Sequence, residues 1–197
     1  DFDIPKWERW YFLGMGLLRM AQRGELRQAE QAFTRVETLG RADGPFNLSR
    51  VYLKEGRVDD AADALRRAVA FEPPSPPWLL SWFTALVNKQ NGQLDEAIAN
   101  FRHILNTDFE EARQREFDFS QDFRVINELA QTLFERAKRE RGPGRLEQRD
   151  RFLNEARQWF EETLQFDPEN TAAHYNLALI HTLLGDEERA TKHRQLN

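Results

Sequence analysis

A short spacing recurs along this chain: a small residue is preceded by glycine five positions earlier and followed by a bulky apolar residue four positions later. Three copies are complete: Gly24, Ala29 and Phe33; Gly56, Ala61 and Leu65; and Gly92, Ala97 and Phe101. A fourth copy keeps Ala156 and Phe160, and the last keeps Gly185 and Ala190 but has Arg194 at the bulky position. Successive alanines are 32, 36, 59 and 34 residues apart. A period of about 34 residues indicates repeated units that stack on one another.

Each unit contains two helical patterns. In the last unit Ala173, Leu177 and Ile180 recur at three- and four-residue steps, which place them on one face of a helix. In the second unit we expect helices over residues 46–55 and 58–71, because Pro73 and the residue after it cannot continue a helix. Alternation of apolar and polar residues over the length of a strand is rare. The sequence therefore predicts an all-α fold, a helix-turn-helix repeat solenoid of about five hairpins.

The period also sets the expected domain organisation. We expect a single repeat domain over residues 1–197, with units at about 5–41, 42–76, 77–111, 123–169 and 170–197. The long gap between alanines predicts a linker insertion at about 112–122 and a second insertion near 141–148. Because the sequence starts at Asp1 and stops abruptly at Asn197, we expect it to be a fragment of a longer chain.

The repeated residues resemble those of the tetratricopeptide repeat (TPR), a helix-turn-helix unit with small residues at fixed places and a proline near its end. The best matches are Leu177-Ala178 with Gly185 and Ala190; Tyr52 with Gly56, Ala61, Ala68 and Pro73; and Gly92 with Ala97 and Phe101. The resemblance implies a right-handed superhelix whose first helices line a concave groove for an extended peptide or a partner helix. More loosely, Ile4-Pro5-Lys6-Trp7 and Trp82-Phe83 are similar to repeat regions attached to bacterial multihaem cytochromes, although the chain has no Cys-x-x-Cys-His motif.

Composition narrows the classes of partner. The chain has 33 acidic and 28 basic side chains and a net charge of −5, with the two signs interleaved, which argues against nucleic acid. Basic residues cluster between Arg136 and Arg151, but Glu140, Glu147 and Asp150 lie among them, so we attribute the cluster to solubility and intrahelical pairing. No apolar run approaches the ~18 residues of a membrane span, so we expect no membrane insertion. A soluble chain of this kind fits either the cytoplasm or the bacterial periplasm.

No pattern in the sequence indicates catalysis, a cofactor or a metal. The chain lacks Cys, and no Ser lies in a Gly-x-Ser-x-Gly context. His174 and His181 stand seven residues apart on one helical face, but TPRs usually carry packing aromatics there, so we expect structural or solvated roles. Adjacent acidic pairs such as Glu161-Glu162 point in different directions on a helix. We therefore predict no catalytic, cofactor-binding or metal-binding residue.

Alignment of the units on their glycines and alanines gives the candidate binding residues. It places ten polar or aromatic side chains on the inner face of the first helices: Asn47, Arg50, Lys54, Trp82, Lys89, Arg124, Asn127, Gln131, Tyr175 and Asn176. Amides and cations suit the backbone and carboxylates of a peptide, and Trp82 suits an apolar anchor. We expect an acidic or C-terminal peptide as the partner. Packing of Trp82 and Tyr175 between repeats is the alternative.

Other interpretations remain open at this stage. The insertion carries Phe117, Phe119 and Phe123, whose rings need cover, and we expect it to fold back onto the groove. A polar last helix, expected over residues 187–196, suits a cap at the end of the array. The chain could instead be a structural or self-association module of a larger multidomain protein, including a homodimer, or the recruiting segment of an enzyme.

Overall fold

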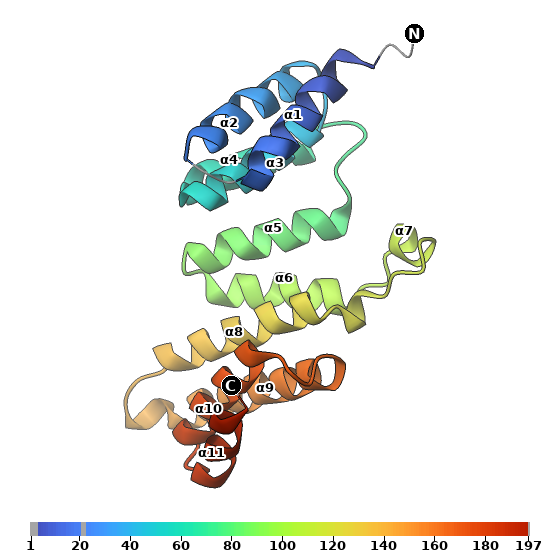
Figure 1. Ribbon diagram of the computed structural model, residues 1–197. Coiled ribbons are helices and arrows are strands. Elements are labelled where there is room, and N and C mark those ends of the chain that lie inside the picture. Colours follow the sequence, from blue (N-terminus) through green and yellow to red (C-terminus); the bar gives the residue numbers. More distant parts are fainter. Residues whose placement is uncertain (1–3, 21–22, 197) are drawn as a thin grey trace. The chain divides into compact units, whose positions relative to one another are not determined.

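The computed structural model describes residues 4–20 and 23–196, and within these ranges every regular element is a helix (Figure 1). The all-α prediction is confirmed. The chain forms two compact units, Asp1–Asn91 and Gly92–Asn197. Each unit is described by itself below.

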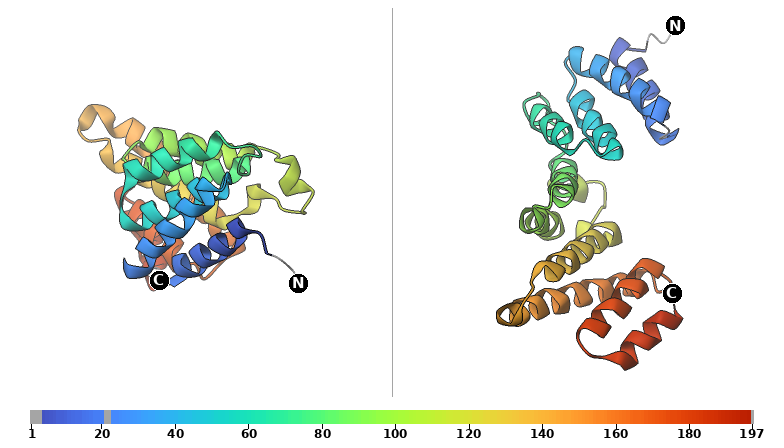
Figure 2. Two further views of the ribbon diagram at one scale, coloured as in Figure 1. Left: turned by 90° about the horizontal axis from the view of Figure 1, so that it is seen from above. Right: turned by 90° about the vertical axis from the view of Figure 1, so that its left-hand side faces the viewer.

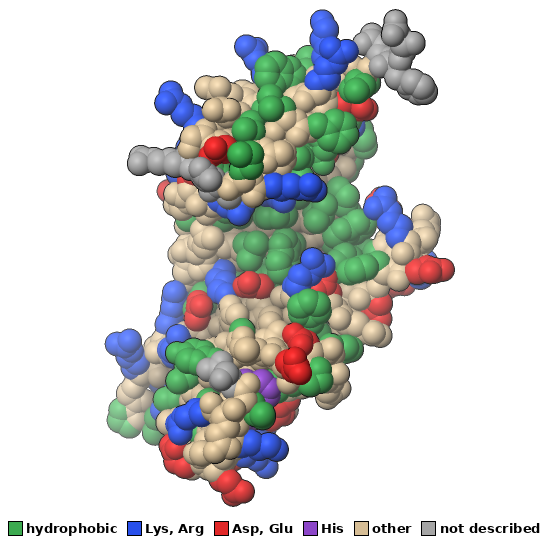
Figure 3. Space-filling model, in the orientation of Figure 1, with side chains coloured by type: hydrophobic (Ala, Val, Ile, Leu, Met, Phe, Trp, Pro, Cys, Tyr) green, Lys and Arg blue, Asp and Glu red, His purple; other side chains and the backbone are tan. Residues whose placement is uncertain are grey.

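The described residues of unit 1 form five helices that pack in chain order. They are α1 (Lys6–Met20), α2 (Arg23–Thr38), α3 (Asp43–Glu55), α4 (Val58–Val69) and α5 (Pro77–Gln90). Each helix contacts the next, and α3 also contacts both α1 and α5. The first helices of the predicted hairpins, α1, α3 and α5, are therefore neighbours. Hydrophobic side chains form a band over α5 in Figure 3.

Unit 2 contains longer helices and two irregular segments. Its elements are α6 (Leu94–Asn106), α7 (Glu110–Arg113), the 3-10 turn η1 (Phe119–Gln121), α8 (Phe123–Arg139), the 3-10 turn η2 (Pro143–Arg145), α9 (Leu146–Phe166), α10 (Thr171–Leu183) and α11 (Glu187–Gln195). α8 packs on α6 and α9, and α10 packs on α9 and α11. Figure 2 shows α8 and α9 side by side. α7 lies in a loop that projects from the end of α6.

The residues of the repeated spacing form the core. Ala29, Ala61, Ala97, Ala156 and Ala190 all have 0% exposure. Their bulky partners Phe33, Phe101 and Phe160 are also fully buried, and Leu65 is buried. A larger side chain at these alanines would overpack the contact between helices, at a typical cost of about 1–3 kcal/mol. This is the physical reason for the spacing.

The repeated spacing places a glycine where each hairpin is expected to turn, and three of these four glycines have the left-handed backbone that favours glycine. The φ angles are +73° at Gly56, +76° at Gly92 and +81° at Gly185. The prediction for Gly24 is wrong: it is the second residue of α2, and its φ is not positive. Helix limits also differ slightly from expectation, since α3 begins at Asp43 and α4 ends at Val69.

Another glycine is required by a close approach between helices. A Cβ atom built on Gly44, at the start of α3, would lie 2.3 Å from the backbone nitrogen of Glu37 in α2. Real Cβ atoms do not approach a backbone atom this closely. α2 and α3 can therefore pack at this distance only with glycine at position 44.

No helix among residues 4–20 and 23–196 combines the length and apolar character needed to cross a membrane.

Candidate binding surface

The candidate surface in unit 1 is formed by α1, α3 and α5, and we call it the first-helix surface. Asn47, Arg50 and Lys54 follow one another on α3 at three- and four-residue steps. Trp82 and Lys89 lie on α5 and are half-buried. Because α3 contacts both α1 and α5, its side chains lie at the centre of this surface.

Arg50 is the best-positioned polar group on the first-helix surface. One of its Nη atoms donates to Asn47 Oδ1 at 2.8 Å and approaches Met15 Sδ at 3.7 Å. Its guanidinium carbon lies 5.7 Å from the ring centroid of Phe83, which packs edge-on against Phe46 at 5.2 Å. Burial among these groups lowers the pKa of Arg50, although an arginine stays charged.

Arg50 has no carboxylate partner within the part of the chain that the structure describes. Its charged or titratable neighbours are Tyr11 and Arg19. Arg19 and Lys54 likewise make no ion pair among the described residues. A half-buried guanidinium without a counter-ion is unfavourable, and an anion placed beside it would relieve that cost.

A hollow of about 290 Å³ opens beside Arg50 between α1 and α3. It is lined by Met15, Leu18, Arg19, Arg50 and Lys54, and we call it the basic hollow. Three cations and two apolar side chains line it, and no acidic residue does. The basic hollow therefore suits a negatively charged group next to an apolar one.

Asn47 supports Arg50 and is not open to solvent. Its side chain is 2% exposed. Its Nδ2 donates to the carbonyl oxygen of Asp43 at 2.8 Å, and its Oδ1 accepts from Arg50. Asn47 therefore holds the guanidinium of Arg50 in place from the buried side of the surface.

The other predicted binding residues lie in unit 2, on α8 and α10, which contact each other. Arg124 pairs with Asp122 at 3.1 Å, and the side chain of Asn176 donates to Ala172 O at 2.8 Å. Asn127 has a buried Oδ1 that lacks a hydrogen-bond partner. Tyr175 is 53% exposed. Gln131, also on α8, is half-buried.

The basic cluster of unit 2 is electrostatically different because most of its arginines are paired with carboxylates. Arg136 bonds to Asp95 at 2.8 Å and to Glu140, and Arg145 bonds to Glu140 at 3.0 Å. Glu140 is 4% exposed, and Arg145 and Arg136 together hold its pKa below the usual range. Arg149 pairs with Asp150 at 2.8 Å. The Arg145–Glu140 pair links the turn before α9 to the end of α8, and the Arg136–Asp95 pair links α8 to α6.

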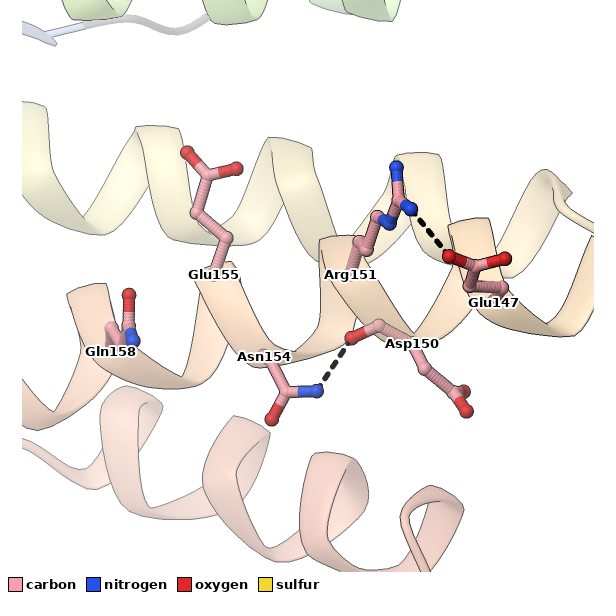
Figure 4. Close-up of a pocket in the computed structure, with 6 residues that line it drawn as sticks. All are labelled: Glu147, Asp150, Arg151, Asn154, Glu155 and Gln158. Atoms are coloured by element: carbon pink, nitrogen blue, oxygen red, sulfur yellow. Dashed lines mark hydrogen bonds and ion pairs between the residues drawn. The ribbon is translucent and has the colours of Figure 1, made fainter.

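A polar hollow of about 480 Å³ on α9 shows the same pairing (Figure 4). Arg151 pairs with Glu147, and Asn154 donates to the carbonyl oxygen of Asp150 at 2.8 Å. Glu155 pairs with Arg102 of α6. Since Arg151, the cation that lines this hollow, is paired with Glu147, the hollow offers no unmatched cation among the described residues.

The histidines of unit 2 have packing roles. His174 is 5% exposed and His181 is 2% exposed. His174 Nε2 lies 2.9 Å from Pro168 O, so this nitrogen donates, and His174 Nδ1 accepts from His193 Nδ1 at 2.9 Å. His181 stacks on His193 at 5.6 Å. Among the described residues, no group of three or more His, Cys, Asp or Glu side chains is arranged to hold a metal ion.

Part of the basic hollow, and the aromatic ring beside it, were not predicted from the sequence. Arg19, Met15 and Leu18 of α1 line the hollow, and Phe83 lies against Arg50. A signal was present, because the 32-residue offset between the first two alanines puts Met15 opposite Asn47 and Leu18 opposite Arg50. Arg19 stands one position away from that register, and no spacing identifies it.

Comparison with known proteins gives a family and a fold. The model of the tetratricopeptide repeat family matches residues 13–76 and 46–116. A solved structure of MamA from Desulfovibrio magneticus RS-1 has a TM-score of 0.70 at 13% identity, covering 98% of this chain and 93% of that one.

Two further MamA structures are similar. One has a TM-score of 0.64 at 15% identity, with 88% of this chain and 87% of that one covered. The other, MamA of MSR-1, has a TM-score of 0.63 at 19% identity, with 95% of this chain and 94% of that one covered. Identities this low show a shared fold alone. No curated protein sequence matches the chain.

Proposed function

Because the chain belongs to the tetratricopeptide repeat family, a family of protein-interaction scaffolds, we propose that it is a non-catalytic scaffold that holds a peptide or partner helix. The partner lies on the first-helix surface of unit 1. An acidic side chain or a C-terminal carboxylate of the partner enters the basic hollow.

The observation that carries this proposal is the unpaired, half-buried Arg50. Asn47 and Met15 hold its guanidinium in place, so little side-chain entropy is lost when a carboxylate binds. Arg19 and Lys54 add positive charge on the same hollow. Hydrogen bonds to charged groups contribute about 1.5–3 kcal/mol, which corresponds to roughly tenfold or more in affinity.

Apolar contact would come from the same surface. Phe83 and Trp82 lie on α5, and Met15 and Leu18 line the hollow itself. Large aromatic side chains dominate the binding energy of many peptide interfaces. A ligand with an apolar residue next to its acidic group therefore fits this surface best.

Fluorescence anisotropy with three labelled peptides tests the proposal. The first peptide alternates Asp and Leu and has a free C-terminus, the second is the same peptide amidated, and the third replaces Asp with Asn. We expect the first to bind and Arg50→Ala to weaken it about tenfold or more with an unchanged melting temperature. Asn47→Ala with Arg50→Ala should weaken it at least as much but lower the melting temperature, because Asn47 is buried and hydrogen-bonded. Arg151→Ala is the matched control, because this exposed arginine is paired with Glu147. Equal affinity of wild type and Arg50→Ala would refute the proposal.

Self-association is a second candidate, favoured by the outer side of α1. Trp10, Leu13 and Met20 recur on one side of this helix and are 39%, 49% and 60% exposed. Helices with apolar residues at this spacing pair with one another. Light scattering separates the two functions: a monomer leaves α1 uncovered, whereas a dimer that Leu13→Glu dissociates would assign this face to self-association.

A further inference from the structure

The insertion in unit 2 forms a second hollow, with a different character from the basic hollow. α6 ends at Asn106, and α7, a turn and η1 follow before α8 begins (Figure 1). A hollow of about 470 Å³ opens between the end of α6 and this segment, and we call it the insertion hollow. Its apolar wall consists of Leu105, Phe109, Ala112, Phe117 and Phe119.

The aromatic rings of the insertion cover one another only in part. Phe117 and Phe119 are 4.7 Å apart between centroids, Phe119 and Phe109 are 5.7 Å apart, and Phe109 packs on His103 at 5.8 Å. Phe117 nevertheless remains 44% exposed. A large apolar ring therefore lies exposed on the wall of the hollow.

Three acidic groups surround this ring, and two of them have no partner of opposite charge among the described residues. Asp108, Glu116 and Asp118 line the hollow together with Arg113. Arg113 is already paired with Asp108. Glu116 and Asp118 have no cation partner among residues 4–20 and 23–196, and the exposed Arg115 is the neighbouring base.

The two unpaired carboxylates belong to a fixed turn. Asp118 accepts from the backbone N–H and hydroxyl of Ser120 at 2.9 and 2.7 Å, and these bonds hold the pKa of Asp118 below its usual range. Glu116 N–H donates to Arg113 O and Phe117 N–H donates to Ala112 O, both at 2.9 Å. These bonds fix the carboxylate of Asp118 and the backbone that carries Glu116 and Phe117.

We propose that the insertion hollow binds a short basic segment of a partner protein, in which a Lys or Arg stands next to an apolar residue. The aliphatic stem of the basic side chain covers Phe117, its cation reaches Glu116 and Asp118, and the apolar residue enters between Leu105 and Phe119. A cation over an aromatic face and an apolar stem on its surface are both favourable contacts. The exposed ring calls for an apolar occupant, and the unpaired carboxylates select a positively charged one. The proposal is independent of the proposed function, because the basic hollow selects the opposite charge.

Anisotropy of labelled peptides on the whole chain tests this inference. The first probe alternates Lys and Leu, the second replaces Lys with Glu, and the third replaces Leu with Ser. We expect the first to bind at least tenfold more tightly than either of the others. Phe117→Ala and the double variant Glu116→Gln with Asp118→Asn should each weaken it at least fivefold. Asn at position 118 keeps an oxygen that accepts from Ser120, so the turn is retained.

Two controls separate this site from general charge effects. Glu147→Gln removes an exposed acid that is already paired, and it should leave binding unchanged. Arg50→Ala should also leave it unchanged. Unchanged binding by Phe117→Ala, equal binding of the Lys and Glu probes, or no binding of the Lys probe at millimolar concentration would overturn the inference. Melting temperatures of the variants within a few degrees of wild type confirm that the comparison concerns folded protein.

Discussion

The basic hollow of unit 1 and the basic cluster of unit 2 differ in whether their cations have carboxylate partners. Around the second insertion, Arg139 donates to the carbonyl oxygen of Gly92, and four arginines have carboxylate partners: Arg136, Arg145, Arg149 and Arg151. In unit 1 the three cations of the basic hollow have none within the described residues. The sequence shows the dense cluster of unit 2 far more clearly than the dispersed cations of unit 1.

From this difference we expect that pairing, more than density, decides whether cations are available to a ligand. A guanidinium that already bonds to a carboxylate must break that bond before it binds another anion. Arg50 has no such bond to break. A run of basic residues is therefore a weaker indication of anion binding than a single buried cation without a partner.

Charge reversal in the basic hollow has the largest expected effect on this contrast. Arg50→Glu with Lys54→Glu places two negative charges where the ligand carboxylate would lie, and like charges across an interface cost several kcal/mol. We expect the affinity for the Asp-Leu peptide to fall about 100-fold or more, measured by anisotropy. An affinity within a factor of three of wild type would mean that the peptide does not use this hollow.

Removing the shared carboxylate of unit 2 should instead affect stability. Glu140→Ala leaves Arg136 and Arg145 without their common acceptor, so we expect the thermal midpoint to fall by several degrees while peptide affinity is unchanged. Glu147→Ala, which removes an exposed pair, is the control. Equal melting temperatures of Glu140→Ala and Glu147→Ala would contradict a stabilising role for the shared carboxylate.

The same carboxylate predicts a pH dependence. The pKa of Glu140 is lowered in the folded protein, so its contribution is present above the ordinary pKa of a glutamate and is lost as the pH falls through the lowered value. Thermal melts of wild type and Glu140→Gln should therefore differ at pH 6 and converge only in strong acid. Equal melting temperatures of the two proteins already at pH 6 would show that the charge of Glu140 does not stabilise the fold.

Burial of His181 and His193 in unit 2 disfavours their charged form, as burial does for Arg50. Unlike arginine, a histidine can lose its proton and become neutral. Burial, followed by the nearby His174 and His181, lowers the pKa of His193. Lys192 acts in the same direction. A histidine with a lowered folded pKa contributes stability above its unfolded pKa of about 6.5, and this stability is lost as the pH falls below that value. We expect the midpoint to drop by a few degrees from pH 7 to pH 5, and to drop less in His193→Gln. Parallel pH profiles for the two proteins would contradict this.

The smallest effect is expected for a paired, exposed arginine. Arg151→Ala should change the free energy of unfolding by less than about 0.5 kcal/mol, because exposed ion pairs contribute little. It should also leave peptide affinity within a factor of two. A tenfold loss of affinity would show that pairing does not protect a cation from ligand binding, and the contrast between the units would then be wrong.

The fold was predictable from the sequence because its determinants are periodic. Ala29 and Phe33 recur as equivalents in later units since every hairpin meets its neighbour in the same way, and all of these alanines are buried. The left-handed turns at Gly56, Gly92 and Gly185 follow from the same regularity.

The candidate site was only partly predictable because it depends on exceptions to the repeat. Arg50 and Lys54 follow from the alignment of the units. Asn47 follows as well, but its burial and its role behind Arg50 depend on side-chain packing. Arg19 and Phe83 come from tertiary contact, since neither stands at an aligned position that marks a ligand. The absence of a carboxylate near Arg50 is likewise a three-dimensional property.

The contact at Gly44 limits how this array can change during evolution or in engineering. With 2.3 Å between a Cβ at this position and the backbone of Glu37, the start of α3 accepts no other residue without moving α2. Hairpins from elsewhere in the array could not be exchanged into this place by simple recombination, even though their alanines align. The second hairpin, which also carries Arg50, is thus tied to its own predecessor, and the two would be inherited or transplanted only as a pair.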